Sequence, residues 1–236
     1  MIEIWYPGCL GDTKQQILDA AEALFAEHGV EAVPLRRIIA EAGVNQAAIH
    51  YHFGSRESLV KAVFARRFDP LNRERISRLE ALEAGTGEGA PSVEEILYAV
   101  VAPAFYVSRD TDSGKRFRRL AGRLLTERPG YLGPIFDELF RDVERRFEIA
   151  FRRALPHLPD SERAWRKHMA IGSMVYVLRE QDWIRESTGG LCDASDVEGT
   201  IRRLVQFMAA GLKGPLADEA CEKALVSRSW QERDTL

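Results

Sequence analysis

The amino-acid sequence predicts an all-α fold in which a small three-helix head precedes a larger helical domain. Apolar residues recur at intervals of three and four along most of the 236 residues, which is the spacing of one face of an α-helix. No stretch alternates apolar and polar residues in the manner of a β-strand. Around residue 43, two short amphipathic patterns are separated by a glycine-containing turn, which predicts a helix-turn-helix.

The head is predicted to begin after a flexible arm of residues 1–11. Its first helix carries apolar residues at helical spacing, namely Ile17, Ala20, Ala21, Leu24 and Phe25. Asp12 or Thr13 is a suitable N-cap, because a short oxygen-bearing side chain accepts hydrogen bonds from the free amides of the first turn. Gly29 is predicted to end this helix.

Two short helices then form the predicted helix-turn-helix. The apolar face of the first of them is Leu35, Ile38, Ile39 and Ala42. Gly43 ends this helix, because the turn requires a positive φ that glycine adopts without strain. Asn45 is predicted to cap the next helix, which runs to His52.

A fourth helix is predicted to start at Ser55, with Glu57 placed favourably against the positive N-terminal end of its dipole. Its core face consists of Leu59, Val60, Val63, Phe64 and Phe68. The Asp69-Pro70 pair is predicted to bend or end it, because proline lacks the backbone N–H that a helix interior needs.

The rest of the chain predicts further helices of the larger domain. After a loop from Gly85 to Pro91, Ser92 and Glu95 form a capping box, and Pro103 is expected to kink the helix that follows. A break is predicted at Pro129-Gly130. The other helices run from about Lys115 to Glu127, through an aromatic face from Phe136 to Phe151, from about Ser161 to Ile184, and from Val197 to Leu212.

Composition narrows the protein class. With 45% hydrophobic and 29% charged residues, the chain is typical of soluble globular proteins. Its apolar stretches are far shorter than the roughly 20 residues of a membrane-spanning helix, and no partner membrane is expected. The first residues lack the basic start and apolar run of a secretory signal. Three widely separated cysteines suit a reduced compartment, so a cytoplasmic location is predicted.

The second helix of the helix-turn-helix has an outward face suited to DNA. This face is Gln46, Ala47, His50 and Tyr51. Small side chains permit close approach to base edges, while glutamine and tyrosine donate hydrogen bonds. The net charge of the chain is −3 and residues 12–68 carry balanced charge, so binding would depend on where the cations lie.

These residues resemble the DNA-binding domain of the TetR family. The resemblance is carried by Ile17-Leu18-x-Ala20-Ala21-x-x-Leu24-Phe25-x-x-x-Gly29, and then by Ile38-x-x-x-Ala42-Gly43-Val44-x-x-x-x-Ile49-x-Tyr51-His52-Phe53-x-Ser55-Arg56-x-x-Leu59. It implies a homodimeric repressor that binds double-stranded operator DNA and leaves it when a small, largely apolar effector binds. The implied parts are a DNA-binding domain over residues 12–58, a ligand-binding and dimerisation domain over 59–213, and a polar tail over 214–236.

The resemblance also implies which residues contact DNA. Gln46, Ala47 and Ala48 would face bases, while Arg36, His50, Tyr51, His52 and Arg56 would contact phosphates or nearby bases. Thr13 and Arg37 are further predicted DNA contacts. Two positions depart from the family pattern: Pro34 replaces the usual Ser or Thr cap, and His50 replaces a frequent Tyr. His52 is alternatively a packing residue between helices.

The C-terminal part resembles a fatty-acid-responsive branch of the same family through Arg66-Arg67, Pro70-Leu71-Asn72-x-x-Arg75, Gly190-x-Cys192-Asp193 and Phe207-x-Ala209-Ala210-Gly211-Leu212. This favours an apolar effector such as a long-chain acyl compound, although aromatic pockets serve many chemistries. The predicted ligand contacts are Phe105, Tyr106, Arg123, Phe136 and Phe140. Arg118 and Arg119 are alternative partners for an acidic ligand head, and the aromatic stripe is alternatively plain core.

Small residues on two apolar helices predict a two-fold four-helix dimer interface, as is familiar in this family. Its predicted residues are Met169, Gly172, Ser173, Tyr176, Leu204, Met208 and Gly211.

Two alternative functions are an all-helical enzyme and a helix-turn-helix protein that binds no ligand. An all-helical enzyme would need a clustered nucleophile, base or metal set, and the sequence lacks the Gly-rich phosphate loop, H-E-x-x-H and G-x-S-x-G motifs. No cofactor is predicted, and no metal either, because the i, i+2 spacing of His50 and His52 points them to different sides of a helix. A helix-turn-helix protein without a ligand would lack a cavity in its larger domain.

Overall fold

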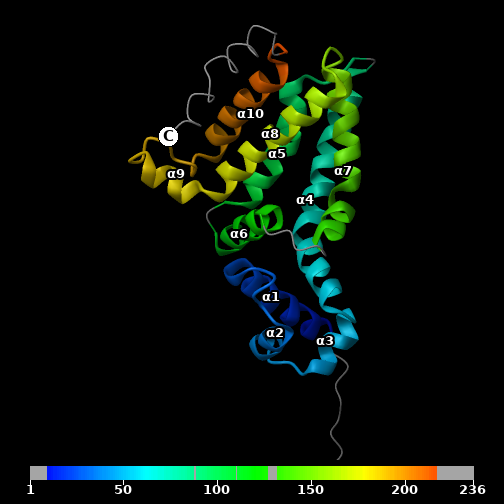
Figure 1. The fold of residues 1–236 in the computed structure, drawn as a ribbon, viewed down its shortest axis with the longest axis vertical. Coiled ribbons are helices and arrows are strands. Elements are labelled where there is room, and N and C mark those ends of the chain that lie inside the picture. The colour runs from blue at the N-terminus through cyan, green and yellow to red at the C-terminus, as the bar shows by residue number, and fades with distance from the viewer. Residues whose placement is uncertain (1–9, 88, 110, 127–131, 217–236) are drawn as a thin grey trace, which may run out of the picture.

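The computed structural model describes residues 10–87, 89–109, 111–126 and 132–216, and all its regular structure there is helical (Figure 1). The prediction of an all-α protein with a three-helix head and a larger helical domain is confirmed. The predicted break at Pro129-Gly130 lies outside the described residues, as do most of the arm and of the polar tail.

The head consists of α1 (Leu10–His28), α2 (Leu35–Ala42) and α3 (Gln46–Phe53). It closes around a core that includes Phe25, Ile38 and Ile49. Gly43 has a φ of 64°, as predicted for the turn, and its N–H donates to Ala40 O. The α1 helix begins earlier than predicted, so Thr13 lies within the helix and not at its cap.

Capping decides where α2 and α3 begin. The Asn45 side chain accepts from the Ala48 N–H at 2.9 Å, which fixes the start of α3. Pro34 precedes α2 without any side-chain cap, in line with the predicted departure from the family pattern.

The longest helix, α4 (Arg56–Thr86), connects the head to the larger domain. It passes through Pro70 without interruption, so the prediction of a bend or end at Asp69-Pro70 is wrong. Asp69 and Pro70 are exposed, while Phe68 and Leu71 beside them are buried, so packing of the inner face sustains the helix. The helix also crosses the predicted domain boundary between residues 58 and 59.

The larger domain contains α5 (Val93–Val107), α6 (Asp112–Thr126), α7 (Leu132–Ala154), α8 (Asp160–Arg179), α9 (Gln181–Ser187) and α10 (Val197–Lys213). The capping box of Ser92 and Glu95 is present, and Pro103 lies inside α5. The single helix predicted from Ser161 to Ile184 is in fact two, because Glu180 leaves the helical ladder after its N–H bonds Tyr176 O.

Figure 1 shows α6 between the head and the bundle formed by the upper part of α4 with α5, α7, α8 and α10. In the part of the chain that the structure describes, no helix is long and apolar enough to cross a membrane.

Candidate functional site

The outward face of α3 is exposed as predicted. Gln46, Ala47, His50 and Tyr51 are all open to solvent, whereas Ile49 turns into the head core. Thr13 of α1 lines the same shallow surface depression as Ala47, Ala48, Tyr51 and His52. The structure therefore brings seven of the predicted DNA-contacting residues together, six on α3 and Thr13 in the first turn of α1.

The predicted DNA-contacting arginines of the head differ in exposure and in hydrogen-bond partners. Arg36 is exposed on α2, and Arg37 beside it lies 2.7 Å from His28 Nε2. Arg56 is engaged: its guanidinium donates to Val33 O at 2.6 Å and also to Val30 O. Arg56 thus stabilises the α1–α2 loop, a role that sequence reasoning missed because loop carbonyls leave no mark in the sequence.

The two histidines of α3 have separate surroundings. His50 is exposed, while His52 is half-buried, with its ring centroid 5.1 Å from that of Tyr51 in an edge-to-face arrangement. Across the described residues, no group of three or more potential metal ligands is present.

A buried ion-pair cluster joins α1 to α4. Glu22 is only 2% exposed and accepts hydrogen bonds from both Arg66 and Arg67. Arg67 also donates to Ser113 Oγ of α6 at 3.0 Å, so the cluster includes three helices. Burial alone would raise the pKa of Glu22, but the hydrogen bonds from Arg67 and Arg66 outweigh it, and the pKa lies below its ordinary value.

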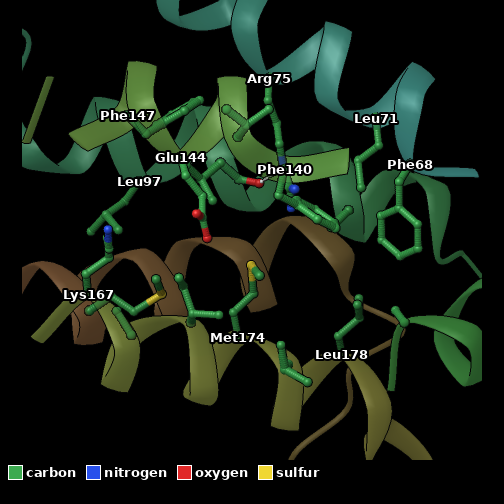
Figure 2. Close-up of a pocket in the computed structure, with 18 of the residues that line it drawn as sticks. Phe68, Leu71, Arg75, Leu97, Phe140, Glu144, Phe147, Lys167, Met174 and Leu178 are labelled. Atoms are coloured by element: carbon green, nitrogen blue, oxygen red, sulfur yellow. Dashed lines mark hydrogen bonds between the residues drawn. The ribbon is translucent and has the colours of Figure 1, made fainter. Parts of the chain in front are cut away.

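The larger domain encloses an apolar cavity of about 140 Å³ (Figure 2). Its wall comes from α4, α5, α6, α7, α8 and α10. The larger apolar side chains in the wall are Phe68, Leu71, Leu97, Phe117, Phe136, Phe140, Phe147, Phe151, Ile171, Met174, Leu178, Met208 and Leu212. An apolar cavity with a few polar groups in its wall is the default candidate for a ligand site.

Two of the five predicted ligand residues line this cavity. Phe136 and Phe140 of α7 stack on one another with ring centroids 4.6 Å apart. Phe105 and Tyr106 do not line it, because the face of α5 toward the cavity carries Leu97, Val100 and Ala104. The Tyr106 hydroxyl instead bonds Glu198 at 2.8 Å.

Arg123, the fifth predicted ligand residue, also lies outside the cavity. Its guanidinium donates to Ala26 O at 3.1 Å and to Glu27 O at 2.6 Å, the last carbonyls of α1, which lack helical donors. The alternative candidates fare no better: Arg118 is buried against Ser108 O, and Arg119 lines a separate polar depression.

The charged groups of the cavity are Arg75, Glu144 and Lys167 (Figure 2). Arg75 is 6% exposed, and burial lowers its pKa to about 10, so it remains a cation at neutral pH. Arg75 belongs to the C-terminal family motif, but the sequence predicts no role for it. Its signal was its place on the buried stripe of α4, four residues after Leu71 and four before Leu79.

The predicted dimer residues divide into two groups. Met169 and Tyr176 are 66% and 54% exposed, and Gly172 and Gly211 are also open. Leu204 and Met208, by contrast, are only 6% and 4% exposed, so both belong to the protomer's own core.

The orientation of α10 explains this correction, because Leu204 and Met208 lie on the face that the helix buries in its own protomer, whereas Gly211 lies on the solvent face. Phe207, 69% exposed, occupies the outward position next to Met208. Ser173 is half-buried, and its hydroxyl donates to Ala170 O at 2.7 Å.

Two family models match the chain. The model of bacterial regulatory proteins of the tetR family matches residues 17–63, and that of the tetracyclin repressor-like C-terminal domain matches residues 98–211. Together they span more than half of the sequence.

Curated relatives resemble a part of the chain. The HTH-type transcriptional regulator SrpR of Pseudomonas putida is 38% identical over 60 residues, which are 25% of this chain and 28% of that protein. The HTH-type transcriptional repressor AcnR of Corynebacterium glutamicum is 40% identical over 52 residues, which are 22% of this chain and 28% of that one. The chain therefore spans less than a third of the length of these two relatives.

Solved structures extend the likeness to the whole fold. The fatty acid degradation regulator FadR from Bacillus halodurans has a TM-score of 0.59 at 18% identity, over 89% of this chain and 99% of that one. A SmeT–triclosan complex has a TM-score of 0.57 at 23% identity, over 88% and 100%.

Proposed function

This chain belongs to the TetR family of transcriptional regulators, and from that premise we propose that it is a homodimeric repressor released from its operator by a small, largely apolar molecule. The observation that carries the proposal is the pairing of an exposed recognition surface on α3 with an apolar cavity in the larger domain, both attached to one helix, α4.

DNA contact is proposed for the exposed face of α3 together with Thr13 and Arg36. Gln46 and Ala47 would approach base edges, while Tyr51 and Arg36 would contact phosphates. Two copies of α3 must reach successive major grooves about 34 Å apart, so the spacing between subunits governs affinity.

The proposed dimer uses the exposed apolar faces of α8 and α10. The outward stripe on α8 is Trp165, Met169, Gly172 and Tyr176, and Phe207 extends it on α10. Large apolar side chains gathered on two adjacent helices are the usual sign of a subunit interface.

Ligand response is proposed to act through α4. Phe68 and Leu71 of this helix line the cavity, and the adjacent Arg66 and Arg67 hold Glu22 of α1. A ligand that binds better when α4 is displaced would shift the head with it, and a few kcal/mol of differential affinity is enough to change the population.

Two similar structures support an apolar effector by analogy. SmeT is described in complex with triclosan, and FadR from Bacillus subtilis, with a TM-score of 0.51 at 16% identity, in complex with stearoyl-CoA. The mainly aromatic and aliphatic wall of the cavity in this chain agrees with that class of ligand.

The direct test is to select bound sequences from random DNA duplexes with the purified full chain. The enriched duplex is then titrated in a fluorescence anisotropy assay with and without candidate effectors. We expect one enriched two-fold-symmetric sequence and its release by an effector. If no sequence is enriched, the proposed sequence-specific DNA binding is refuted. If no effector releases the enriched duplex, the proposed ligand response is refuted.

A further inference from the structure

The Arg75 guanidinium is a buried cation directed into the apolar cavity. Figure 2 shows its side chain extending from α4 toward the middle of the drawn residues. A charge so removed from water is costly unless an opposite charge or several hydrogen bonds compensate it.

The partners of Arg75 leave its charge uncompensated. Its Nε donates to Val100 O at 2.9 Å, and one terminal nitrogen donates to Asn72 Oδ1 at 3.3 Å. Both partners are neutral, and a guanidinium has five N–H groups, so three remain for another acceptor. Among the described residues no carboxylate oxygen lies within 4 Å of Arg75.

The other two charged groups of the wall lie at the solvent side. Glu144 is exposed, and both Glu144 and Lys167 also line a shallow depression on the surface. Lys167 Nζ is already paired with Glu148 at 3.1 Å. Water screens Glu144 more than it screens Arg75, so Arg75 governs the charge preference of the cavity interior.

We propose that the effector is a compact organic monoanion whose carboxylate binds Arg75 and whose apolar body fills the cavity. This inference rests on the regulator function proposed above and specifies its ligand. It also assigns Arg75 as a ligand-binding residue, in place of Arg123.

Charge and geometry favour a carboxylate over other anions. One guanidinium neutralises one negative charge, whereas a phosphate monoester would bring about one further charge into an apolar wall. A planar carboxylate also accepts two parallel N–H groups from a guanidinium edge.

The size of the cavity limits the apolar body. A dry cavity of about 150 Å³ accommodates one benzene molecule, so the 140 Å³ here suits an aromatic ring or a short branched chain. A long acyl chain would require the wall to open.

The test compares acids with neutral isosteres on the wild-type protein. Benzoate, phenylacetate, 3-phenylpropanoate and octanoate are titrated by calorimetry at pH 7 beside benzyl alcohol, 2-phenylethanol, 3-phenylpropanol and octanol. We expect at least one acid to bind about tenfold to a hundredfold more tightly than its alcohol, as is usual for a hydrogen bond to a charged group. Equal affinities within every pair, or no binding of any acid, would overturn the proposal.

The variants Arg75→Met and Arg75→Gln remove the charge, and the latter retains donors for the Val100 carbonyl if the former fails to fold. Both should abolish the acid preference and leave alcohol binding within about threefold. Arg78→Met is the matched control on the same helix, because Arg78 pairs with Glu74 and does not line the cavity. Retention of the acid preference in both Arg75 variants would overturn the assignment.

Direct binding is measured without DNA, so the two proposals fail separately. Acid-selective binding that leaves the operator complex intact would refute the ligand-released repressor but not the Arg75 site. Release by the alcohols as readily as by the acids would refute the Arg75 site but not the repressor.

Discussion

Arg67 of α4 holds Glu22 of α1 through two parallel hydrogen bonds, from Nε at 2.9 Å and from a terminal nitrogen, one to each carboxylate oxygen. Arg66 donates to the same carboxylate and also to Asp19 at 2.6 Å. The bidentate arrangement fixes the orientation as well as the distance between the two helices. The head is therefore attached to the larger domain by a directional contact in addition to apolar packing.

Replacing Glu22 by Gln should destabilise the fold by about 3 kcal/mol, because it leaves two cations without their buried partner. The figure is at the lower end for broken buried pairs, since Arg66 keeps Asp19. Urea unfolding measures the loss. Glu31→Gln, at an exposed position, is the control and should change stability by less than about 0.5 kcal/mol. Equal stability of the two variants would contradict the prediction.

The pKa of Glu22, lowered below the ordinary 4.5, also predicts a pH dependence. A carboxyl whose pKa is depressed by folding contributes stability above its unfolded pKa, and loses it as the pH falls through the folded value. The wild type should therefore lose stability below about pH 4.5, with a shallower loss in Glu22→Gln. Unfolding midpoints measured between pH 3 and 7 give the comparison. Parallel curves would exclude Glu22 as a contributor.

Substitutions on the exposed face of α3 should affect either sequence specificity or overall DNA affinity, depending on the residue. Gln46→Ala is expected to reduce discrimination against mutated operators by about 1–3 kcal/mol, because a base-edge contact is lost. Tyr51→Phe should weaken binding to all duplexes alike, since a phosphate contact carries no sequence information. Affinities on matched and single-substitution operators decide between them. If Gln46→Ala instead weakens binding to all operators equally, the Gln46 side chain contacts the DNA backbone and not a base.

Arg56→Ala should lower the stability of the head. Loss of the hydrogen bonds to the Val30 and Val33 carbonyls is expected to cost about 1.5 kcal/mol of stability. Operator affinity should fall with an unchanged salt dependence. A decrease of about 0.9 in the slope of log affinity against log salt would instead indicate a direct phosphate contact.

The neighbours Phe207 and Met208 provide a matched test of the proposed dimer. Phe207 is 69% exposed and Met208 only 4% exposed. Phe207→Asp should yield a folded monomer with weak operator binding, whereas Met208→Asp should unfold the protomer by burying an unpaired carboxylate at a cost of several kcal/mol. Sedimentation and circular dichroism distinguish the two results. A dimeric Phe207→Asp variant would place the interface elsewhere.

Local signals in the sequence were enough to predict the head. The cap at Asn45 and the turn at Gly43 depend on residues close in sequence, and both are present in the structure. The exposed face of α3 followed from helical periodicity alone.

What escaped prediction depends on contacts between distant segments. The continuity of α4 through Pro70 follows from burial of the opposite face against other helices. Arg123 donates to the carbonyls of Ala26 and Glu27 at the end of α1, which lie 97 and 96 positions before it in the sequence. Which of two adjacent residues, Phe207 or Met208, faces inward depends on a rotation of α10 that periodicity does not set to within one position.

The uninterrupted course of α4 has a mechanical consequence. From Arg75 to Arg56 the helix rises about 28 Å, at 1.5 Å per residue, so a small tilt of the helix at the cavity wall would be amplified at its far end. A tilt of only about 5° there would move the far end by about 2.5 Å, which is most of the 3.4 Å rise of a base pair. Under the proposed ligand response, a ligand no larger than a single ring would therefore be enough to move α3 out of register with a DNA groove.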